Sequence, residues 1–594
     1  MRPDQNGRMQ DMHAWSSVQA PHDIQFSISA GSDDPAMLLL LTLPHALLAP
    51  RATASLHARA RPRAVRPCAA AAAGSGTPPS GSGTSGTTSS GAQRRRALDA
   101  DFAAIAVPAL AQFAAEPIAG LVDTAYLGRL GVTALGGAGV AISAHYATAK
   151  LFNDPLLRTS ISIVASGDGA GETERDGAIS AALVLALAVG LLQAAFFAVA
   201  APSLISVMGV APGSAMRPVA VSYLRVRALG MPAATLWLVA NGIFRGLGDT
   251  RTPLKWALLF SALNAALDPL FIFPLRMGAA GAAAGTALSQ SLALVGLLRV
   301  LRARTGVPIS PAVLLAPASL RRLAPSLRAY GTAGVLVFLR TWGKVAAYTY
   351  CSRTAAGLGA VASAAHLLCF NLGVVLSQLC ESVAVATQTL LARAMGTLRR
   401  SAAAGAAAAE GTDARDSQGL PMGREAVAVA AAAAAARSDA WHVIRRGALV
   451  GGAIASALTA ATAARPAAVI AGLTTDTSVR AACATIVAPV LACQLFKGLA
   501  FPANGVVMGG LDWGFATAEV WAGTALCIAL VHLPVPFSAA SAAARPAVPS
   551  LTSIWIGLAA FMASQTLFSV ARVASRAGPW ALLFHRDRTA DAAK

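Results

Sequence analysis

Residues 240–273, ANGIFRGLGDTRTPLKWALLFSALNAALDPLFIF, join two apolar segments through a short polar loop. The first ten of them return 263 positions later as ANGVVMGGLD, residues 503–512, with Ala, Asn, Gly, Gly and Asp at matching places. A repeat of this kind indicates that the chain consists of two related halves.

The second part of the stretch is an apolar segment that carries two polar residues, Asn264 and Asp268. They are four positions apart and therefore share one face of a helix. An ionised carboxylate at the centre of a bilayer costs roughly 2.5–3.5 kcal/mol on insertion scales, so such residues face a bundle interior and mark an ion or substrate path. The same offset of 263 leads to Cys527 and Val531, so this pair belongs to one half only.

The composition is that of a polytopic membrane protein. Of 594 residues, 55% are hydrophobic and 12% charged, and the mean hydropathy is +0.59. Twelve apolar stretches are each long enough, at roughly 20 residues, to cross the bilayer as a helix. They are 101–124, 134–165, 178–207, 218–242, 256–274, 279–298, 328–350, 358–392, 447–471, 482–508, 514–533 and 552–571.

The distribution of Arg and Lys supports this number of spans. If both termini lie on the side of synthesis, the segments on that side hold 26 basic residues and the opposite loops hold seven. The net charge of +20 then reflects topology and targeting, and no nucleic-acid partner is expected. The cysteines form no CxxC or CxxH pair, so we expect free thiols, no metal site and no cofactor.

The first 98 residues have the composition of a transit peptide followed by a disordered linker. Residues 35–98 contain many Arg, Ser and Ala and no acidic residue. A plastid address is preferred to secretion, and Met37 is a second candidate for the initiator. We expect a multi-pass protein of a chloroplast membrane, the envelope in preference to the thylakoid.

Beyond this leader the chain divides into two groups of six spans. The first half covers residues 99–305, a connector covers 306–326 and the second half covers 327–575. An Ala-rich, low-complexity insertion at 397–439 is expected to be a disordered or weakly helical loop. A polar tail, 576–594, ends the chain.

Several charged residues lie inside the apolar stretches. We interpret the ladder Lys150, Asp154 and Arg158 as a helix-to-helix pairing rather than a substrate contact. Two arginines near the start of the fourth stretch are expected to reach toward the interface: Arg225 and Arg227. The second half has charges that are expected to pair with one another: Arg340, Lys344, Glu381 and Lys497. Asp123, near the end of the first stretch, is either an interfacial acid or a functional one.

The motifs resemble those of the multidrug and toxic compound extrusion (MATE) family, in particular its DinF-like branch. The matching segments are PALAQFAAEPIAGLVDTAYLGRLG, FNDPLLR, SYLRVRALGMPA, NGIFRGLGDTRTPL, NAALDPLFIF, GAAGAAAGTALSQ and LAFPANGVVMGG, which extend from residue 101 to about residue 515. The resemblance implies an all-α protein of twelve transmembrane helices in two pseudo-symmetric six-helix lobes. It also implies export of an organic solute in exchange for protons or sodium.

The resemblance further implies a cation-coupling site in the first lobe, with no metal. Its members are the acid of the VDT motif, the amide of the NG motif, the pair four apart and a threonine of the sixth helix: Asp123, Asn241, Asn264, Asp268 and Thr286. A low-dielectric lobe disfavours the ionised form of a carboxyl group, so these acids suit a proton site. Basic residues stand where some family branches have acids in the second lobe, which argues against a second cation site there.

Other functions remain as alternatives. A membrane enzyme lacks support, because the helices contain no HxxxH or DxxxD pair and the histidines His145, His366 and His532 stand alone. An uncoupled organic-anion facilitator or channel, or a lipid flippase of related architecture, is compatible with the same residues. We expect a monomer in the lipid bilayer that carries a small organic solute. The sequence names neither the solute nor the coupling ion.

Overall fold

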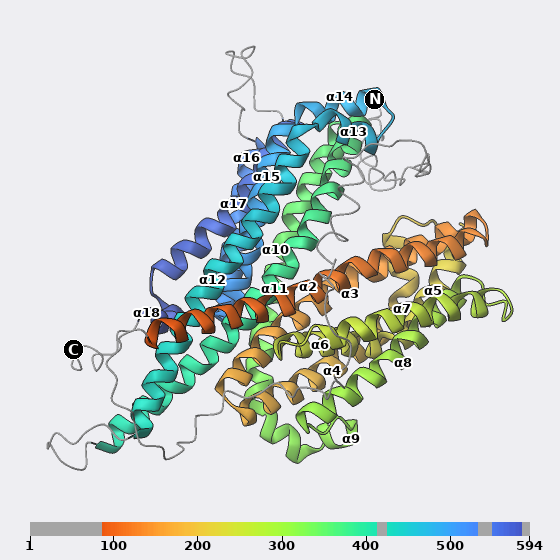
Figure 1. Cartoon of the computed structure of the whole chain (residues 1–594). Coiled ribbons are helices and arrows are strands. Elements are labelled where there is room, and N and C mark those ends of the chain that lie inside the picture. The colour runs from red at the N-terminus through yellow and green to blue at the C-terminus, as the bar shows by residue number, and fades with distance from the viewer. Residues whose placement is uncertain (1–85, 413–423, 533–548, 585–594) are drawn as a thin grey trace, which may run out of the picture. The chain divides into compact units, whose positions relative to one another are not determined.

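The computed structural model describes residues 86–412, 424–532 and 549–584. The contacts divide the chain into Met1–Ser89 and Ser90–Lys594, and nearly all of the described residues belong to the second unit. The predicted transit peptide falls almost wholly on residues 1–85 and most of the polar tail on 585–594, both outside the described residues. The described chain is a succession of helices without a strand (Figure 1).

The first half of the chain contributes seven helices, and the predicted fourth span is divided between two of them at Gly230. They are α2 Gly86–Gly128, α3 Val132–Ala170, α4 Glu172–Val207, α5 Met216–Leu229, α6 Met231–Gly246, α7 Arg251–Ile272 and α8 Ala279–Thr305. Within this half, α7 packs against α8, and α3 packs against α4, α5 and α6.

The second half has six long helices, which Figure 1 shows in green to blue. They are α10 Pro317–Gly357, α11 Ala360–Thr412, α12 Arg424–Ala464, α15 Val487–Gly509, α16 Trp513–His532 and α17 Leu551–Ala574. Short helices connect or follow them: α9 Pro311–Leu314, α13 Pro466–Leu473, α14 Thr477–Thr485, a 3₁₀ turn Gly578–Trp580 and α18 Ala581–Phe584.

Eleven of the twelve predicted stretches each coincide with one helix over most of their length, and the fourth is divided between α5 and α6. Among the described residues, nine helices are long and apolar enough to cross a membrane. The predicted stretches that fall outside these nine lie on α3 and α10, which carry several charges, and on the divided pair α5 and α6. The all-α membrane fold is therefore confirmed, and the count of twelve spans stays a prediction.

The repeated ANG motif has the same packing role in both halves. A Cβ on Gly242 of α6 would lie 2.8 Å from the backbone oxygen of Leu157 on α3. A Cβ on Gly505 of α15 would lie 2.6 Å from the backbone oxygen of Ala384 on α11. The next glycine of each motif, four residues further on, is pressed against the same neighbour. The motif thus provides a small-xxx-small face on which a second helix packs closely.

The aspartate that ends the repeat also has equivalent partners. Asp249 accepts a hydrogen bond from Thr252 Oγ1 at 2.6 Å and pairs with Arg304 at the end of α8. Asp512 pairs with Arg572 at the end of α17, at 2.8 Å. In each half this acid ties the loop after the motif to the last long helix of that half.

The Ala-rich insertion is more regular than the sequence predicted. Residues 397–412 continue α11 and residues 424–439 begin α12, whereas 413–423 lie outside the described residues. Alanine has the highest intrinsic helix propensity, and Ala433, Ala436 and Ala440 are buried as α12 packs along α11. Low complexity therefore did not mean loss of structure in these parts.

The two halves meet mainly where α3 contacts α10 and α11. Arg158 of α3 pairs with Asp154 at 2.8 Å and with Glu381 of α11 at 2.9 Å. Near the carboxyl end of α3, Asp168 pairs with Arg393 of α11 at 2.9 Å. The interpretation of the ladder as a helix-to-helix pairing is confirmed for Arg158, whereas Asp154 pairs with Arg158 inside α3.

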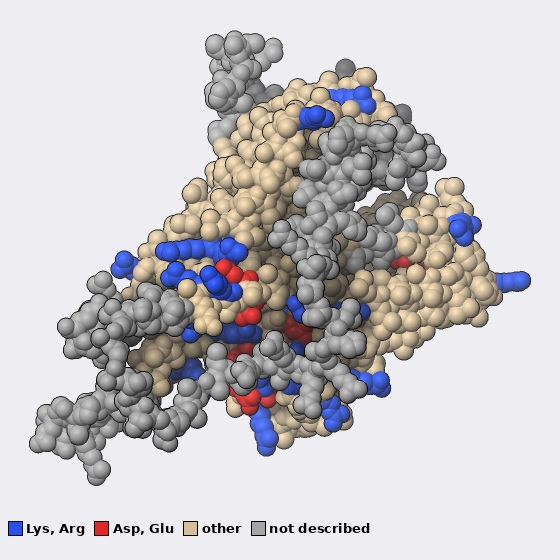
Figure 2. Space-filling view, in the orientation of Figure 1, with Lys and Arg blue, Asp and Glu red and all other residues tan. Residues whose placement is uncertain are grey.

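Ion pairs also connect the amino end of α2 to α12. Arg94 pairs with Asp439 at 2.6 Å, and Asp99 accepts from His442 at 2.9 Å and from Arg446 at 3.3 Å. On the face seen in Figure 2, blue and red side chains gather in one region and most of the remaining described surface is uncharged. A largely uncharged surface is what contact with lipid requires.

Replacement of Gly505 by Ala should destabilise the protein. Its methyl group would meet the backbone of α11, which cannot move aside as a side chain can. We expect the free energy of unfolding to fall by about 1–3 kcal/mol, the usual range for overpacking. This change appears as a lower midpoint of thermal unfolding in detergent. Gly334→Ala in α10, where a Cβ meets nothing within 4 Å, should leave the midpoint unchanged or raise it. Equal midpoints for the two variants would contradict this account of the motif.

Candidate functional site

Two carboxyl groups from different helices are held by one amide in the first half. Asn264 Nδ2 of α7 donates to Asp123 Oδ1 of α2 at 2.7 Å and to Asp268 Oδ2 at 3.2 Å. Asn264 and Asp268 are 3% and 0% exposed, and Asp123 is partly buried. The two carboxyl groups thus bind the same amide and act on each other electrostatically. Two ionised carboxylates bound to one amide repel each other, so protonation of one of them is favoured and this geometry suits a proton.

A glycine of α8 provides the space for Asp268. A Cβ on Gly285 would lie 2.2 Å from Asp268 Oδ1, so no larger residue fits there beside the acid. Thr286 follows directly, and its hydroxyl donates to Ala282 O in its own helix at 2.8 Å.

Asn241 belongs to a different network. It accepts from Gln112 Nε2 of α2 at 2.7 Å and donates to Trp237 O at 2.7 Å. Gln112 Oε1 in turn accepts from Arg245 at 2.9 Å. The structure therefore brings together three of the five predicted residues. In the described part of the chain, Asn241 and Thr286 make no direct hydrogen bond to either acid.

The duplicate of Asn241 repeats this arrangement with other partners. Asn504 Oδ1 accepts from Arg340 of α10 at 2.5 Å, and Asn504 Nδ2 donates to Gln565 of α17 at 3.0 Å. In both halves the amide of the repeat thus binds a side chain from the first long helix of its own half. That partner is neutral Gln112 in the first half and a cation in the second.

Arg227 corrects one expectation from the sequence. It is 8% exposed and donates to Gln290 Oε1 of α8 at 3.2 Å, so it lies inside the helix bundle, whereas Arg225 is exposed. It acts electrostatically on Asp123 and Asp268. Because a nearby cation favours the ionised form of a carboxyl group, Arg227 offsets part of the cost of burying these acids. Spacing along one helix could not show which neighbour it faces.

The expected pairing among the charges of the second half is wrong. Glu381 pairs with Arg158 of the first half, and Lys497 donates to the backbone oxygen of Gly373 at 3.0 Å. Arg340 and Lys344 form no ion pair within the described residues, although both lie in range of other charges. The sequence alone does not show how helices from different halves align with each other. It therefore could not predict which of these charged residues are partners.

Sequence reasoning missed a further acid, Glu519 in α16. It is 2% exposed and accepts a hydrogen bond from Ser569 of α17 at 2.9 Å. The signal was present, because Glu519 is a carboxyl group inside the apolar stretch 514–533, as Asp268 is inside 256–274.

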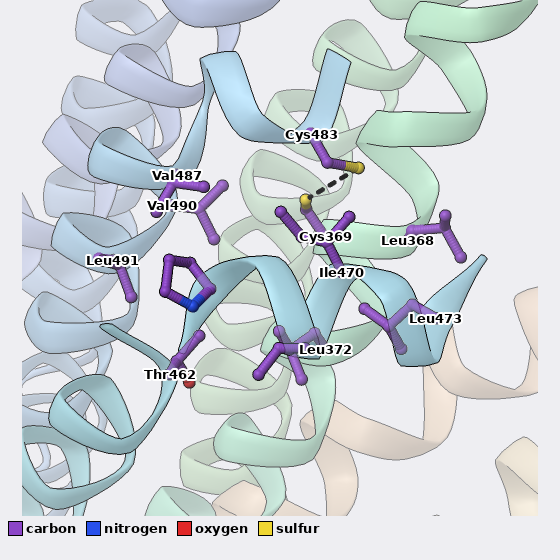
Figure 3. A pocket seen from close by; sticks show the side chains of 12 residues that line it. Leu368, Cys369, Leu372, Thr462, Ile470, Leu473, Cys483, Val487, Val490 and Leu491 are labelled. Carbon is purple, nitrogen blue, oxygen red and sulfur yellow. Dashed lines mark hydrogen bonds between the residues drawn. The ribbon is translucent and has the colours of Figure 1, made fainter. Parts of the chain in front are cut away.

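The cavity in Figure 3 is not suited to an organic solute. It lies among α11–α15, measures about 30 Å³ and is lined almost entirely by apolar side chains. Cys369 and Cys483 point toward each other across one side, with their sulfurs 4.0 Å apart. No group of three His, Cys, Asp or Glu side chains within the described residues could hold a metal ion. The polar cluster around Asn264 is therefore the candidate site.

A helical membrane protein of two related halves, with acids buried among its helices, has the architecture of a membrane transporter. The family model described as MatE matches residues 108–270. Protein DETOXIFICATION 44, chloroplastic, from Arabidopsis thaliana is 31% identical over 490 residues, covering 81% of this chain and 83% of that protein. DNA damage-inducible protein F from Escherichia coli is 32% identical over 201 residues, 33% of this chain and 43% of that protein.

The fold agrees with solved structures of the same kind. A mutant of the MATE transporter VcmN from Vibrio cholerae superposes with a TM-score of 0.64 at 15% identity, covering 83% of this chain and 100% of that one. The chain belongs to the MATE family, whose members are multidrug and toxic compound efflux transporters acting on small organic solutes in membranes.

Replacement of Asn264 by Ala should destabilise the protein in a pH-dependent way. The variant loses both amide hydrogen bonds, at a cost of about 1–3 kcal/mol where the acids are ionised and buried. The loss should be smaller at about pH 5 than at about pH 8, because protonated carboxyl groups are less costly to bury and can bind each other. Thermal unfolding at both pH values measures it.

Ser291→Ala provides the matched control, since Ser291 only donates within α8, to Ala287 O at 2.7 Å. Its effect should be small and independent of pH. A pH-independent loss in Asn264→Ala would mean that the amide does not hold the two acids.

Proposed function

We propose that this protein is a secondary antiporter that exports a small organic solute in exchange for protons or sodium, by alternating access between its two halves. The observation that carries the proposal is the pair of carboxyl groups, Asp123 and Asp268, joined by the amide of Asn264. Asn241 and Thr286 belong to the proposed site as residues that support its helices. No cofactor is required beyond the coupling ion.

The pair is suited to coupling because its charge decides how the helices around it pack. With a proton bound, the two carboxyl groups satisfy each other and hold α2 against α7. With both ionised, they repel, and a nearby cation, Arg227, or a solute becomes the favoured partner. Coupling requires that the ion bind two packings of the protein with different affinity, and this change in charge provides such a difference.

The contact between the halves offers a set of interactions that alternation must break and remake. Arg158 with Glu381 joins α3 to α11 at one level, and Asp168 with Arg393 joins them at another. Partly exposed ion pairs are of modest strength, so they can separate without a large barrier. These pairs therefore suit an interface that opens in each cycle.

We place the protein in a chloroplast membrane, the envelope rather than the thylakoid. Two observations support the chloroplast: the Arg-rich stretch 35–98, which contains no acidic residue, and the relative from Arabidopsis whose name carries the word chloroplastic. In this setting the protein acts as a monomer on xenobiotic or metabolic organic solutes.

Asp123→Asn and Asp268→Asn should each uncouple transport from the pH gradient. We expect flux of a cationic dye or a phenolic carboxylate in proteoliposomes to follow an imposed gradient in the wild type, and to fall at least about tenfold or lose its pH dependence in both variants. Asp476→Asn is the control: it removes an exposed carboxylate at the start of α14, where Asn caps a helix as well as Asp does.

Each other outcome identifies a different function. If both variants carry the solute with the pH dependence of the wild type, the acids are structural and the protein is an uncoupled facilitator. If neither solute moves but a fluorescent phospholipid is exchanged between leaflets, the protein is a lipid flippase of related architecture. Correct folding of the variants is checked by size-exclusion chromatography.

A further inference from the structure

Each half of the protein contains a buried acid and a buried arginine that act on each other's charge without forming an ion pair. In the first half these are Asp268 and Arg227, and in the second Glu519 and Arg340. One polar atom of each residue has no hydrogen-bond partner within the described chain: Asp268 Oδ1, Arg227 Nη1, Glu519 Oε1 and Arg340 Nε. The family motifs point to the first of these sites only.

Glu519 lies in a helix that is long and apolar enough to cross the membrane, Trp513–His532. Its side chain is 2% exposed and accepts one hydrogen bond, from Ser569 Oγ at 2.9 Å. An ionised carboxylate can accept about four hydrogen bonds, and burying it with so few partners costs several kcal/mol. Protonation removes the charge and turns one oxygen into an O–H donor, so a protonated Glu519 is less costly to bury with these few partners.

The neighbouring helices also allow for the ionised form. Arg340 and Lys344 of α10 and Asp512, just before α16, are the charged groups that act on Glu519. From α17 it receives the hydroxyl of Ser569, and α15 contributes Asn504, which holds Arg340 Nη2 at 2.5 Å. Arg340 thus keeps Nε free of partners on a side chain that is 2% exposed.

We propose that Glu519 is a second proton-binding site, located in the second half of the protein, with Arg340 as its counter-cation. When the carboxyl group releases its proton to water, the carboxylate takes the unpartnered donor of Arg340, which stays charged throughout. When the proton returns, Arg340 remains on Asn504 and Glu519 keeps the hydrogen bond from Ser569. Both charge states then have partners inside the protein.

This site is not the image of the first one. The offset of 263 between the two halves sets Glu519 against Trp256 in α7, and it sets Asn264 and Asp268 against Cys527 and Val531. Binding of the proton at Glu519 does not depend on the proposed antiport, whereas its use in the transport cycle rests on it. The test therefore measures proton binding directly and needs no solute.

Infrared difference spectra between acidic and alkaline pH, recorded on purified protein in nanodiscs, report carboxyl groups that change protonation. We expect Glu519→Gln to lose one buried carboxyl band that the wild type shows. The band should persist in the double variant Asp123→Asn with Asp268→Asn, which lacks the acids of the first half. Asp476→Asn, which removes an exposed acid, should leave it in place.

Arg340→Gln tests the role of Arg340 as the counter-cation. It also provides a second test of the proposal if Glu519→Gln fails to fold. Without the guanidinium the ionised form of Glu519 loses its partner, so the titration midpoint of the band should rise by about one pH unit or more. An unchanged band in Glu519→Gln, or an unchanged midpoint in Arg340→Gln, overturns the proposal. If transport is insensitive to Asp123 and Asp268 while the Glu519 band behaves as expected, the coupling assigned to the first half fails and this site stands.

Discussion

The amide of Asn264, which holds the carboxyl groups of Asp123 and Asp268 inside the first half, is the interaction on which this site depends. In a membrane, water does not satisfy polar groups in the hydrocarbon region, so each buried acid requires a partner within the protein. That requirement explains the glycine that admits Asp268 and the buried arginine close to both acids. An acid in such a place is costly to bury while it is charged or unpaired. Binding or release of a single proton therefore changes which partners it favours.

The duplicated motif packs its helices in the same way in both halves, but the buried polar residues of the two halves differ. Close packing at the ANG glycines and the ties made by Asp249 and Asp512 are shared. The amide of the motif binds neutral Gln112 in one half and Arg340 in the other. The two halves can therefore pack alike although their buried charges differ. Only the first half contains two acids joined by one amide.

Much of the fold could be predicted from the sequence, because apolar length and basic-residue placement report directly on the membrane. The spacing of Asn264 and Asp268 also predicted a shared face, which the structure confirms. The partners of Asn241, Arg227 and Glu381 could not be predicted, since they depend on the register between helices far apart in the chain. Helical structure in the Ala-rich insertion was underestimated, because composition alone did not reveal that Ala433 and Ala436 are buried where α12 packs along α11.

Coupling between two ligands is reciprocal, so a solute gradient must move protons if a proton gradient moves solute. The most direct measurement therefore follows the internal pH of proteoliposomes loaded with a transported solute and diluted into solute-free buffer with no initial pH difference. The account predicts that the interior acidifies as solute leaves, and that Asp123→Asn abolishes the acidification. Solute efflux without any change of internal pH or of internal sodium would contradict it.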